Sequence, residues 1–194
     1  INWGSGDLPE EVLKSNVLNT PQKINIASDK LRFFKTMDKA GGPRIPPYTE
    51  DTQVAIGWAK KGHVVVARKD LHGSGGRGII FFDNPHDFVD AKLYTKYIPK
   101  KCEYRVHFFE DKVIATQQKV LRQHDDEGNR IDPKKIDFRI RNLANGFIFA
   151  RHIDRIPDDI YDQALKASKI SGLTFGAVDV LWNEAGGHAY VLEI

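Results

Sequence analysis

The chain has 194 residues, of which 41% are apolar and 28% are charged, a composition typical of a globular protein. No run of about 18 apolar residues occurs, which argues against a membrane protein. The 29 Lys and Arg and the 26 Asp and Glu are spread along the sequence, so no nucleic-acid-binding tail is indicated. Cys102 is the single cysteine, which excludes an internal disulfide and favours a reducing compartment, by default the cytoplasm.

The first part of the chain predicts one amphipathic helix. Residues 16–26 are polar and read as irregular, and Ser28 can then cap a helix over residues 29–40 that ends at Gly41. Lys30 stands in the first turn of this helix, where a cation is unfavourable unless an anion lies nearby. Lys30 is therefore a candidate phosphate ligand, and the alternative is an ordinary solvated lysine.

A glycine-rich loop joins two predicted strands. A short helix over residues 51–60 leads to a strand at 63–68, and the loop over 69–78 connects it to a second strand at 79–82. Glycines allow backbone N–H groups to turn toward an anion, and the arginines at positions 68 and 77 supply positive charge. The loop is either a phosphate-covering hairpin or a simple surface hairpin.

Three known phosphate-binding motifs do not fit this loop. The spacing Gly73-x-Gly75-x-x-Gly78 matches the dinucleotide fingerprint, but that motif opens a helix, and here a strand follows. A Walker A loop requires Gly-Lys-Ser or Gly-Lys-Thr at its end, which is absent. Protein kinases also place the loop between strands, but the chain lacks His-Arg-Asp and Asp-Phe-Gly.

The middle of the chain predicts an antiparallel sheet with one polar face. A short helix over 85–91 precedes strands at 92–98, 103–109 and 113–121, and the hydrophilic stretch 123–137 reads as a mobile loop. Glu103, Arg105 and His107 share one parity on their strand. Such a face is either exposed to solvent or the floor of a site.

The C-terminal part predicts two more strands, a helix and a hairpin. The strands cover 138–142 and 146–150, and the helix begins at Pro157 and ends at Gly172. The hairpin joins 176–182 to 189–194 through a turn near Gly186.

This turn would bring Asp179 and Glu193 opposite each other on one face of the hairpin. Facing carboxylates repel each other, so the pair is a candidate site for Mg²⁺ or Mn²⁺, with phosphate oxygens completing the coordination. The alternative is a solvent-facing pair on an ordinary hairpin.

The order of these parts resembles the ATP-grasp superfamily, and within it the carboxylate-amine ligases. The pieces are Ser28-Asp-Lys30-Leu-Arg, Glu103-Tyr-Arg105-Val, Arg141-Asn142, and Gly176-Ala-Val-Asp179 followed by Val191-Leu-Glu193-Ile194. No single piece is diagnostic, but several pieces in the right order are much harder to obtain by chance. The resemblance extends from about Lys23 to the last residue.

The resemblance implies an α+β fold in which two α+β lobes with antiparallel sheets hold ATP between them. Residues 1–22 would be the remnant of an N-terminal lobe and linker. Residues 23–92 would form the small lobe with the glycine-rich loop, and residues 93–194 the large lobe with the metal site.

Site residues follow from the resemblance by position. Lys30 and Arg68 would contact the ATP phosphates, beneath the loop residues Gly73, Ser74, Gly75 and Gly76. Lys96, Tyr97 and Ile98 would form the hinge against adenine, with Glu103 near the ribose. Lys119 and Arg141, supported by Asn142, would face the transferred phosphoryl group and the acyl phosphate. Asp179 and Glu193 would hold Mg²⁺ or Mn²⁺.

The chain departs from the family pattern in three respects. Arg68 stands where many members have lysine, which changes a point charge into a planar fork. The family has Asn two residues after the last metal-binding Glu, and the sequence stops at Ile194. The N-terminal lobe is reduced to about 22 residues, so we expect that both ends are clipped.

The sequence thus favours an ATP- and Mg²⁺-dependent ligase that joins a small-molecule or peptide carboxylate to an amine through an acyl phosphate. One alternative is an ATP-dependent kinase or a degenerate nucleotide-binding protein. Another is a non-enzymatic module that binds nucleic acid through Lys100, Lys101, Lys134 and Lys135.

Overall fold

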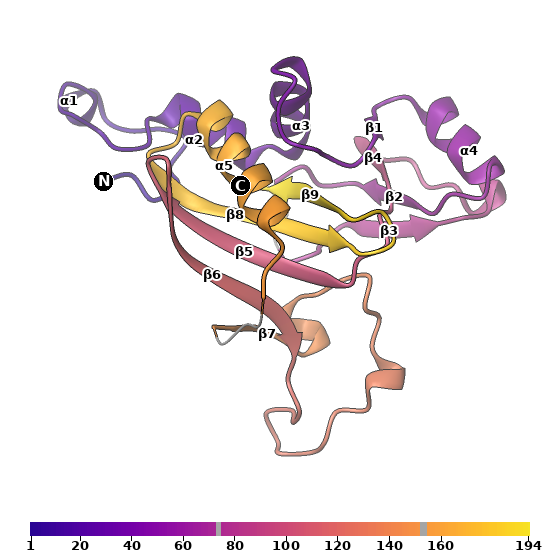
Figure 1. The fold of residues 1–194 in the computed structure, drawn as a ribbon. Helices are drawn as coiled ribbons and strands as arrows, with labels where there is room; N and C mark the ends of the chain where they lie inside the picture. Colours follow the sequence, from indigo (N-terminus) through magenta and orange to yellow (C-terminus); the bar gives the residue numbers. More distant parts are fainter. Residues whose placement is uncertain (73–74, 152–154) are drawn as a thin grey trace.

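The computed structural model describes residues 1–72, 75–151 and 155–194, and these form two antiparallel sheets (Figure 1). The smaller sheet has the strand order β1-β4-β2-β3, and the larger has the order β7-β6-β5-β8-β9. The α+β class expected from the sequence is therefore confirmed. No helix of the described residues is long and apolar enough to cross a membrane.

The small sheet is covered by one helix. Its strands are β1 (Tyr48–Thr49), β2 (Val65–Arg68), β3 (Ile79–Phe82) and β4 (Leu93–Lys96), and the helix is α4 (Thr52–Lys60). Ala55 and Ala59 of α4 pack on the fully buried Val65 and Tyr94. The small side chains on this helix face allow it to lie close to the sheet. The inner face of the sheet stays free for the site.

The large sheet is covered by α5 (Asp158–Ser171). Its strands are β5 (Cys102–Phe109), β6 (Lys112–Leu121), β7 (Phe147–Ala150), β8 (Phe175–Asn183) and β9 (His188–Glu193). Two aspartates lie in the first turn of α5, where the helix dipole favours negative charge, and Gly172 with φ of 68° ends the helix. Ile160 and Ala167 on its buried face pack against Val178 and Val191 of the sheet.

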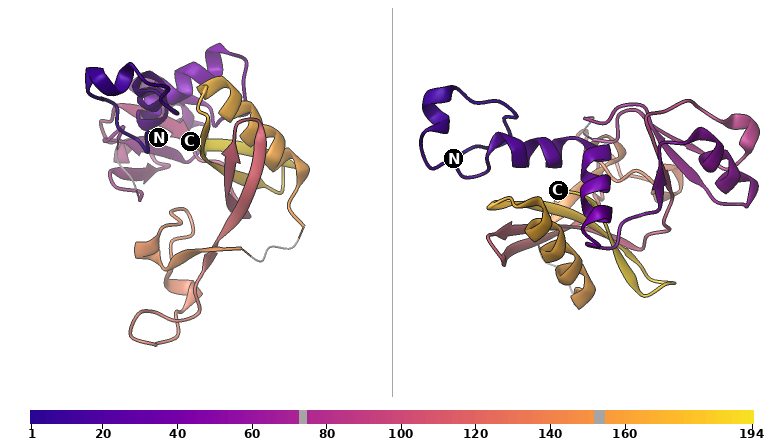
Figure 2. Two further views of the ribbon diagram at one scale, coloured as in Figure 1. Left: turned by 90° about the vertical axis from the view of Figure 1, so that its left-hand side faces the viewer. Right: turned by 90° about the horizontal axis from the view of Figure 1, so that it is seen from above.

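Two N-terminal helices differ from expectation. Residues 16–26 were expected to be irregular, but α2 (Pro21–Ser28) begins within them, with Pro21 in its first turn and Ile24 buried. Ser28 ends α2, and the cap of α3 (Lys30–Lys39) is Asp29, whose carboxylate accepts the Arg32 N–H at 2.9 Å. The short α1 (Glu10–Leu13) buries no residue. Helix α1 and helix α4 lie at opposite ends of the molecule (Figures 1 and 2).

The limits of the two halves also differ from those expected. Strand β4 pairs with β2 over residues 93–96, so the small sheet extends beyond residue 92, where the large lobe was expected to begin. Helix α3 was assigned to the small lobe, but its buried Phe33 and Met37 belong to the core of the large sheet. The apolar face of α3 packs against α2 and α5, and its Phe34 also contacts Tyr48 of β1.

The connection between β6 and β7 runs away from the sheet as a long loop (Figures 1 and 2). It contains the 3₁₀ turns η2 (Pro133–Lys135) and η3 (Leu143–Asn145), whereas η1 (Pro85–Asp87) lies in the small lobe. Residues 138–142 were expected to form a strand and do not. Asn142 instead caps η3 by accepting the Asn145 N–H at 2.9 Å, which turns the chain before β7.

Arg44 ties the segment after α3 to the large sheet. Its carbonyl accepts the Val191 N–H at 2.8 Å, and its Nη1 donates to Asp159 Oδ2 at 2.9 Å. The same Asp159 oxygen accepts the Ala189 N–H at 2.7 Å, and Gln163 donates to its other oxygen at 2.8 Å. The Asp159 carboxylate at the start of α5 therefore joins this helix to β9 and to the segment after α3.

The buried face of α5 gives a stability prediction. Ile160 is fully buried, so Ile160→Ala leaves a cavity and is expected to lower the free energy of unfolding by about 2–5 kcal/mol. Ile114, which is 66% exposed, provides the matched control, and Ile114→Ala is expected to change the free energy of unfolding little. Urea unfolding followed by circular dichroism measures both, and equal effects of the two substitutions would contradict the assigned core.

Asp159 gives a pH prediction. Burial alone raises the pKa of Asp159, but the Ala189 N–H, Gln163 and Arg44 outweigh it and lower the pKa below its ordinary value. The ionised form thus stabilises the fold at pH above about 4, and this stabilisation is lost as the pH falls through the lowered pKa. We expect the stability difference between the wild type and Asp159→Asn to be constant from about pH 5 to 8 and to shrink below about pH 4. A pH-independent difference in urea unfolding would refute this.

Candidate active site

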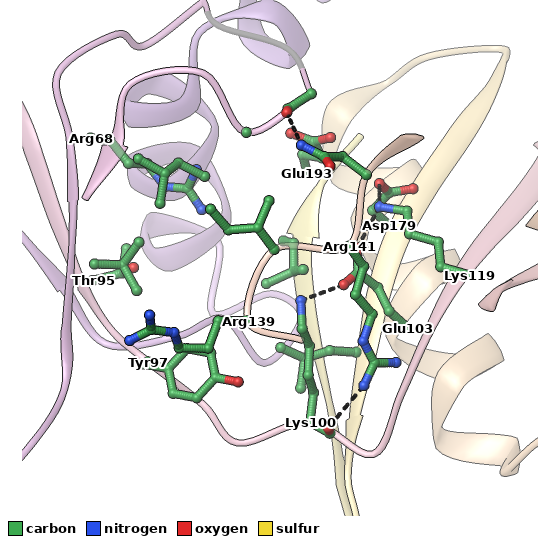
Figure 3. A pocket seen from close by; sticks show the side chains of 18 of the residues that line it. Arg68, Thr95, Tyr97, Lys100, Glu103, Lys119, Arg139, Arg141, Asp179 and Glu193 are labelled. Atoms are coloured by element: carbon green, nitrogen blue, oxygen red, sulfur yellow. Dashed lines mark hydrogen bonds and ion pairs between the residues drawn. The ribbon is translucent and has the colours of Figure 1, made fainter. Parts of the chain in front are cut away.

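A cavity of about 570 Å³ lies between the two sheets (Figure 3). The small sheet contributes side chains from β2, β3 and β4, and the large sheet contributes side chains from all five of its strands. Helix α3, the glycine-rich loop, the segment after β4 and the β6–β7 loop also contribute to the wall. This volume falls in the range typical of small-molecule sites.

Apolar side chains from both sheets line one end of the cavity. Val66 lies between Phe81 and Thr95 in the register of the small sheet, and all three side chains line the cavity. Leu181 and Leu192 line the cavity from the large sheet. A planar aromatic base fits such a surface.

Arg68 marks the polar end of the cavity, at the last residue of β2. Burial lowers the pKa of Arg68, and the negative charges of Glu193 and Glu103 partly oppose this effect. Its buried Nε has no hydrogen-bond partner among the described residues. A buried donor without a partner is costly, and an anionic ligand would satisfy it.

Lys30 joins this end from the first residue of α3, and its Nζ lies 3.4 Å from Glu193. The backbone N–H of Lys30 donates to the Leu71 carbonyl at 3.1 Å, which ties the start of α3 to the glycine-rich loop. The lysine thus stands where the helix, the loop and β9 meet. Gly73 and Ser74 lie outside the described residues.

A buried network of charges forms the floor of the cavity. Asp179 is 2% exposed, and Arg105 donates to it twice, from Nε to Oδ1 at 2.7 Å and from Nη2 to Oδ2 at 2.9 Å. Lys119 donates to the same Oδ2 at 2.9 Å and also to Glu103. Glu103, 3% exposed, accepts a further bond from Lys100. Every carboxylate oxygen in this network has a cationic partner.

The charges of this network depend on one another. Burial raises the pKa of Asp179, but the bonds from Arg105 and the charge of Lys119 outweigh it and lower the pKa. Burial lowers the pKa of Lys119, and Asp179 and Glu103 more than reverse this. Burial lowers the pKa of Lys100 below its ordinary value, and Glu103 only partly opposes this effect. Removing one member leaves a buried charge unpaired, which costs several kcal/mol as an order of magnitude.

Asp179 and Glu193 face each other across β8 and β9, as the hairpin predicted. The register from Asn183–His188 to Val180–Val191 is regular and would pair Asp179 with Leu192. An irregularity between Asp179 and Val180 inserts one residue in β9, so Asp179 pairs with Glu193. Bulges of this kind re-aim a side chain next to a site.

The donor set only partly matches a divalent metal. Asp179 and Glu193 offer the oxygen atoms that Mg²⁺ or Mn²⁺ prefers, and Glu193 is 42% exposed. Within the described ranges, no group of three or more His, Cys, Asp or Glu could hold a metal ion. A metal here would therefore need further oxygen ligands, and phosphate oxygens at this end of the cavity are suitable.

The β6–β7 loop reaches across to the glycine-rich loop. Asn142 Nδ2 donates to the Gly75 carbonyl at 2.5 Å. Gly76 has φ of 81°, and a Cβ there would lie 2.8 Å from Ile140, so the close contact requires glycine. The Arg139 guanidinium lies 4.5 Å from the centre of the Phe81 ring. The two lobes are thus in contact on the loop side of the cavity.

Arg141 belongs to the same loop but contacts the segment after β4. Its Nη2 donates to the carbonyls of Lys100 and Lys101 at 3.2 and 2.9 Å, as Figure 3 shows for Lys100. Its buried Nε has no partner among the described residues. Arg141 is therefore a second guanidinium with an unused donor at the cavity.

The predicted site residues meet in this cavity. It is lined by Lys30, Arg68, Gly75, Gly76, Lys96, Tyr97, Ile98, Glu103, Lys119, Arg141, Asn142, Asp179 and Glu193. Sequence reasoning missed the roles of Arg105, Lys100 and Arg139. The parity of Arg105 on its strand was noted, but only the register shows that Asp179 is its partner.

The proposed nucleic-acid patch is not a cluster of available cations. Lys100 is buried against Glu103, and Lys101 is paired with Glu184. Lys134 and Lys135 lie in η2, within the β6–β7 loop. Two of the four lysines are therefore engaged elsewhere.

Neither a protein-family model nor a curated protein sequence matches this chain. Solved structures do match it. The ATP-grasp ligase PsnB in complex with a minimal precursor superposes with a TM-score of 0.63 and 19% identity, over 94% of this chain and 56% of that chain. D-alanine–D-alanine ligase from Bacillus anthracis gives 0.63 and 17%, over 90% and 58%. Biotin carboxylase from Campylobacter jejuni gives 0.61 and 19%, over 95% and 44%.

The chain thus spans about half the length of the structures that it matches. At these identities the similarity concerns the fold. Enzymes with different substrates share it, and each match covers at least nine tenths of this chain. The fold expected from the sequence is confirmed: this chain has the ATP-grasp fold.

Proposed function

We propose that this protein is an ATP-dependent ligase that activates a carboxylate as an acyl phosphate and joins it to an amine. The observation that carries the proposal is the cavity, in which an apolar end leads to a cluster of cations beside two carboxylates. Nine lysine and arginine side chains line it against four carboxylates among the described residues. A polyphosphate with an aromatic base matches this distribution.

The side chains divide the work by position. Val66, Phe81 and Tyr97 would hold adenine, and Glu103 would lie near the ribose. Arg68 and Lys30 would bind the phosphates beneath the glycine-rich loop. The hydrogen bond from the Asn142 side chain to the Gly75 carbonyl would hold this loop in place. A closed loop excludes water, which protects an acyl phosphate from hydrolysis.

The transfer needs charge stabilisation more than a nucleophilic side chain. A substrate carboxylate oxygen attacks the γ-phosphorus, the bond to the β-phosphate oxygen breaks, and ADP leaves. The amine nitrogen then attacks the acyl carbon, loses a proton and expels inorganic phosphate. Lys119 and Arg141 would stabilise the negative charge that develops in both steps.

Asp179 and Glu193 would hold Mg²⁺ or Mn²⁺, which would neutralise phosphate charge when bound. The substrates are expected to be a small-molecule or peptide carboxylate and an amine. The matched structures support both kinds, because PsnB is described with a precursor peptide and D-alanine–D-alanine ligase is named for an amino acid.

The test is a mass-spectrometric screen of amino acids and short peptides for ATP-dependent condensation. The wild type is expected to form ADP, phosphate and a condensed product. Asp179→Asn is expected to reduce turnover about 100-fold or more, because an amide is a poor metal ligand and leaves the neighbouring cations unbalanced. Asp162→Asn, at an exposed position of α5, is the control and should retain full activity.

Outcomes of this screen separate the alternatives. Transfer of phosphate to a stable product would indicate a kinase, and nucleotide binding without turnover would indicate a degenerate site. Unchanged turnover by Asp179→Asn, with a normal unfolding curve, would remove the proposed metal role. Salt-sensitive binding of nucleic acid without ATP binding would replace the proposal altogether.

Arg68 gives a prediction for nucleotide affinity. Its buried Nε has no partner within the described part of the chain, so Arg68→Gln is expected to weaken ADP binding about 10- to 100-fold. The exposed Arg130 lies far along the β6–β7 loop, and Arg130→Gln is expected to leave the dissociation constant unchanged. Isothermal titration calorimetry with ADP measures both, and equal affinities of the two variants would rule out the phosphate contact.

A further inference from the structure

The charges around Asp179 are unusual for a carboxylate that would hold a metal. Both of its oxygens accept from Arg105, and one also accepts from Lys119. The whole cavity has a formal excess of five positive charges, nine cations against four carboxylates, among its described residues. Without a bound anion, a divalent cation that approaches Asp179 would be repelled by this positive charge. It would also have to displace Arg105 or Lys119 from the carboxylate.

Arg105 is the partner that is able to leave. Its side chain is 33% exposed, whereas the side chains of Lys119 and Asp179 are 13% and 3% exposed. The Arg105 guanidinium lies 4.6 Å from the centre of the Phe149 ring, on β7. The ring offers the guanidinium a cation–π contact that does not depend on Asp179. Arg105 is thus half-buried, has two partners and lines the cavity.

We propose that Arg105, together with Lys119, guards Asp179, so that a divalent cation gains this carboxylate only after a polyphosphate has entered the cavity. Arg105 then acts as a positioning residue that sets the order of binding, with the anion first and the metal second. This inference rests on the proposed function, because it concerns the same site.

Charge balance supports this order. Phosphate oxygens accept bidentate bonds from a guanidinium as well as a carboxylate does, so they compete with Asp179 for Arg105. A triphosphate carries about four negative charges near neutral pH, which removes most of the positive excess. The released Asp179 oxygen, Glu193 and the phosphate oxygens then supply the hard ligands that Mg²⁺ or Mn²⁺ requires.

The experiment follows Mn²⁺ binding by electron paramagnetic resonance, in which free Mn²⁺ gives the signal. For the wild type we expect weak binding of Mn²⁺ alone and at least tenfold tighter binding with a nonhydrolysable ATP analogue. For Arg105→Gln without nucleotide, we expect Mn²⁺ affinity to increase about tenfold, because one positive charge beside Asp179 is gone.

Three further variants make the result specific. Arg130→Gln removes an exposed positive charge in the β6–β7 loop and should not alter Mn²⁺ binding. The double variant Arg105→Gln with Asp179→Asn should not show the increased Mn²⁺ affinity of Arg105→Gln. This result would assign the increase to the Asp179 carboxylate. Lys119→Gln removes the other guard and should produce a gain of its own, so the test remains decisive if Arg105→Gln does not fold.

Failure of the inference differs from failure of the proposed function. Wild-type protein that binds Mn²⁺ equally well with and without the bound analogue would overturn the guarding role, as would variants of either guard that fold and show no gain. If the analogue does not bind at all, the proposed function falls. The gain without nucleotide in Arg105→Gln still decides whether Arg105 guards Asp179.

Discussion

The pairing of Asp179 with Arg105 and Lys119 is the interaction on which the site depends. A carboxylate that is 2% exposed cannot stay ionised without partners, and these two cations hold its charge in place. Lys119 extends the network to Glu103, and Glu103 extends it to Lys100, which lies in the segment between β4 and β5. The interior of the large sheet and the edge of the cavity are therefore joined by one chain of charges. The same charges that a buried acid needs for stability also make the cavity attractive to an anion.

The architecture keeps this network at the meeting point of two lobes. The small sheet buries its outer face against α4 and presents its inner face to the cavity, while α5 covers the far face of the large sheet and α3 packs against α5. The ion pair of Arg44 with Asp159 fixes the segment after α3 to the large lobe. The hydrogen bond from Asn142 to Gly75 connects the β6–β7 loop to the glycine-rich loop. The bond from Asn142 thus connects the two lobes on the loop side of the cavity. Such an arrangement suits a ligand that must be enclosed and then released.

The parts of the fold that depend on local pattern were predictable from the sequence. Alternating strands, the Pro157 start and Gly172 end of α5, and the opposition of Asp179 and Glu193 follow from period, capping and turn chemistry. The expected strand at 138–142 was wrong because the Asn142 side chain caps a 3₁₀ turn there, and a hydrogen bond of this kind leaves little trace in an apolar pattern. Helix α2 was missed because only Pro21 and Ile24 of its residues are buried, so its apolar stripe is weak.

The sequence by itself determined the order of elements and the residue types that the site requires, because propensity, periodicity and charge are local properties. Only the tertiary structure decided which charges are partners. Arg105 meets Asp179 through strand register, and Glu193 reaches the same face through one inserted residue in β9. Lys119 meets Glu103 and Asp179 although 16 and 60 positions separate them in sequence. Side-chain contacts between distant strands depend on register, and a shift of one residue turns every side chain to the other face, so local pattern cannot fix them.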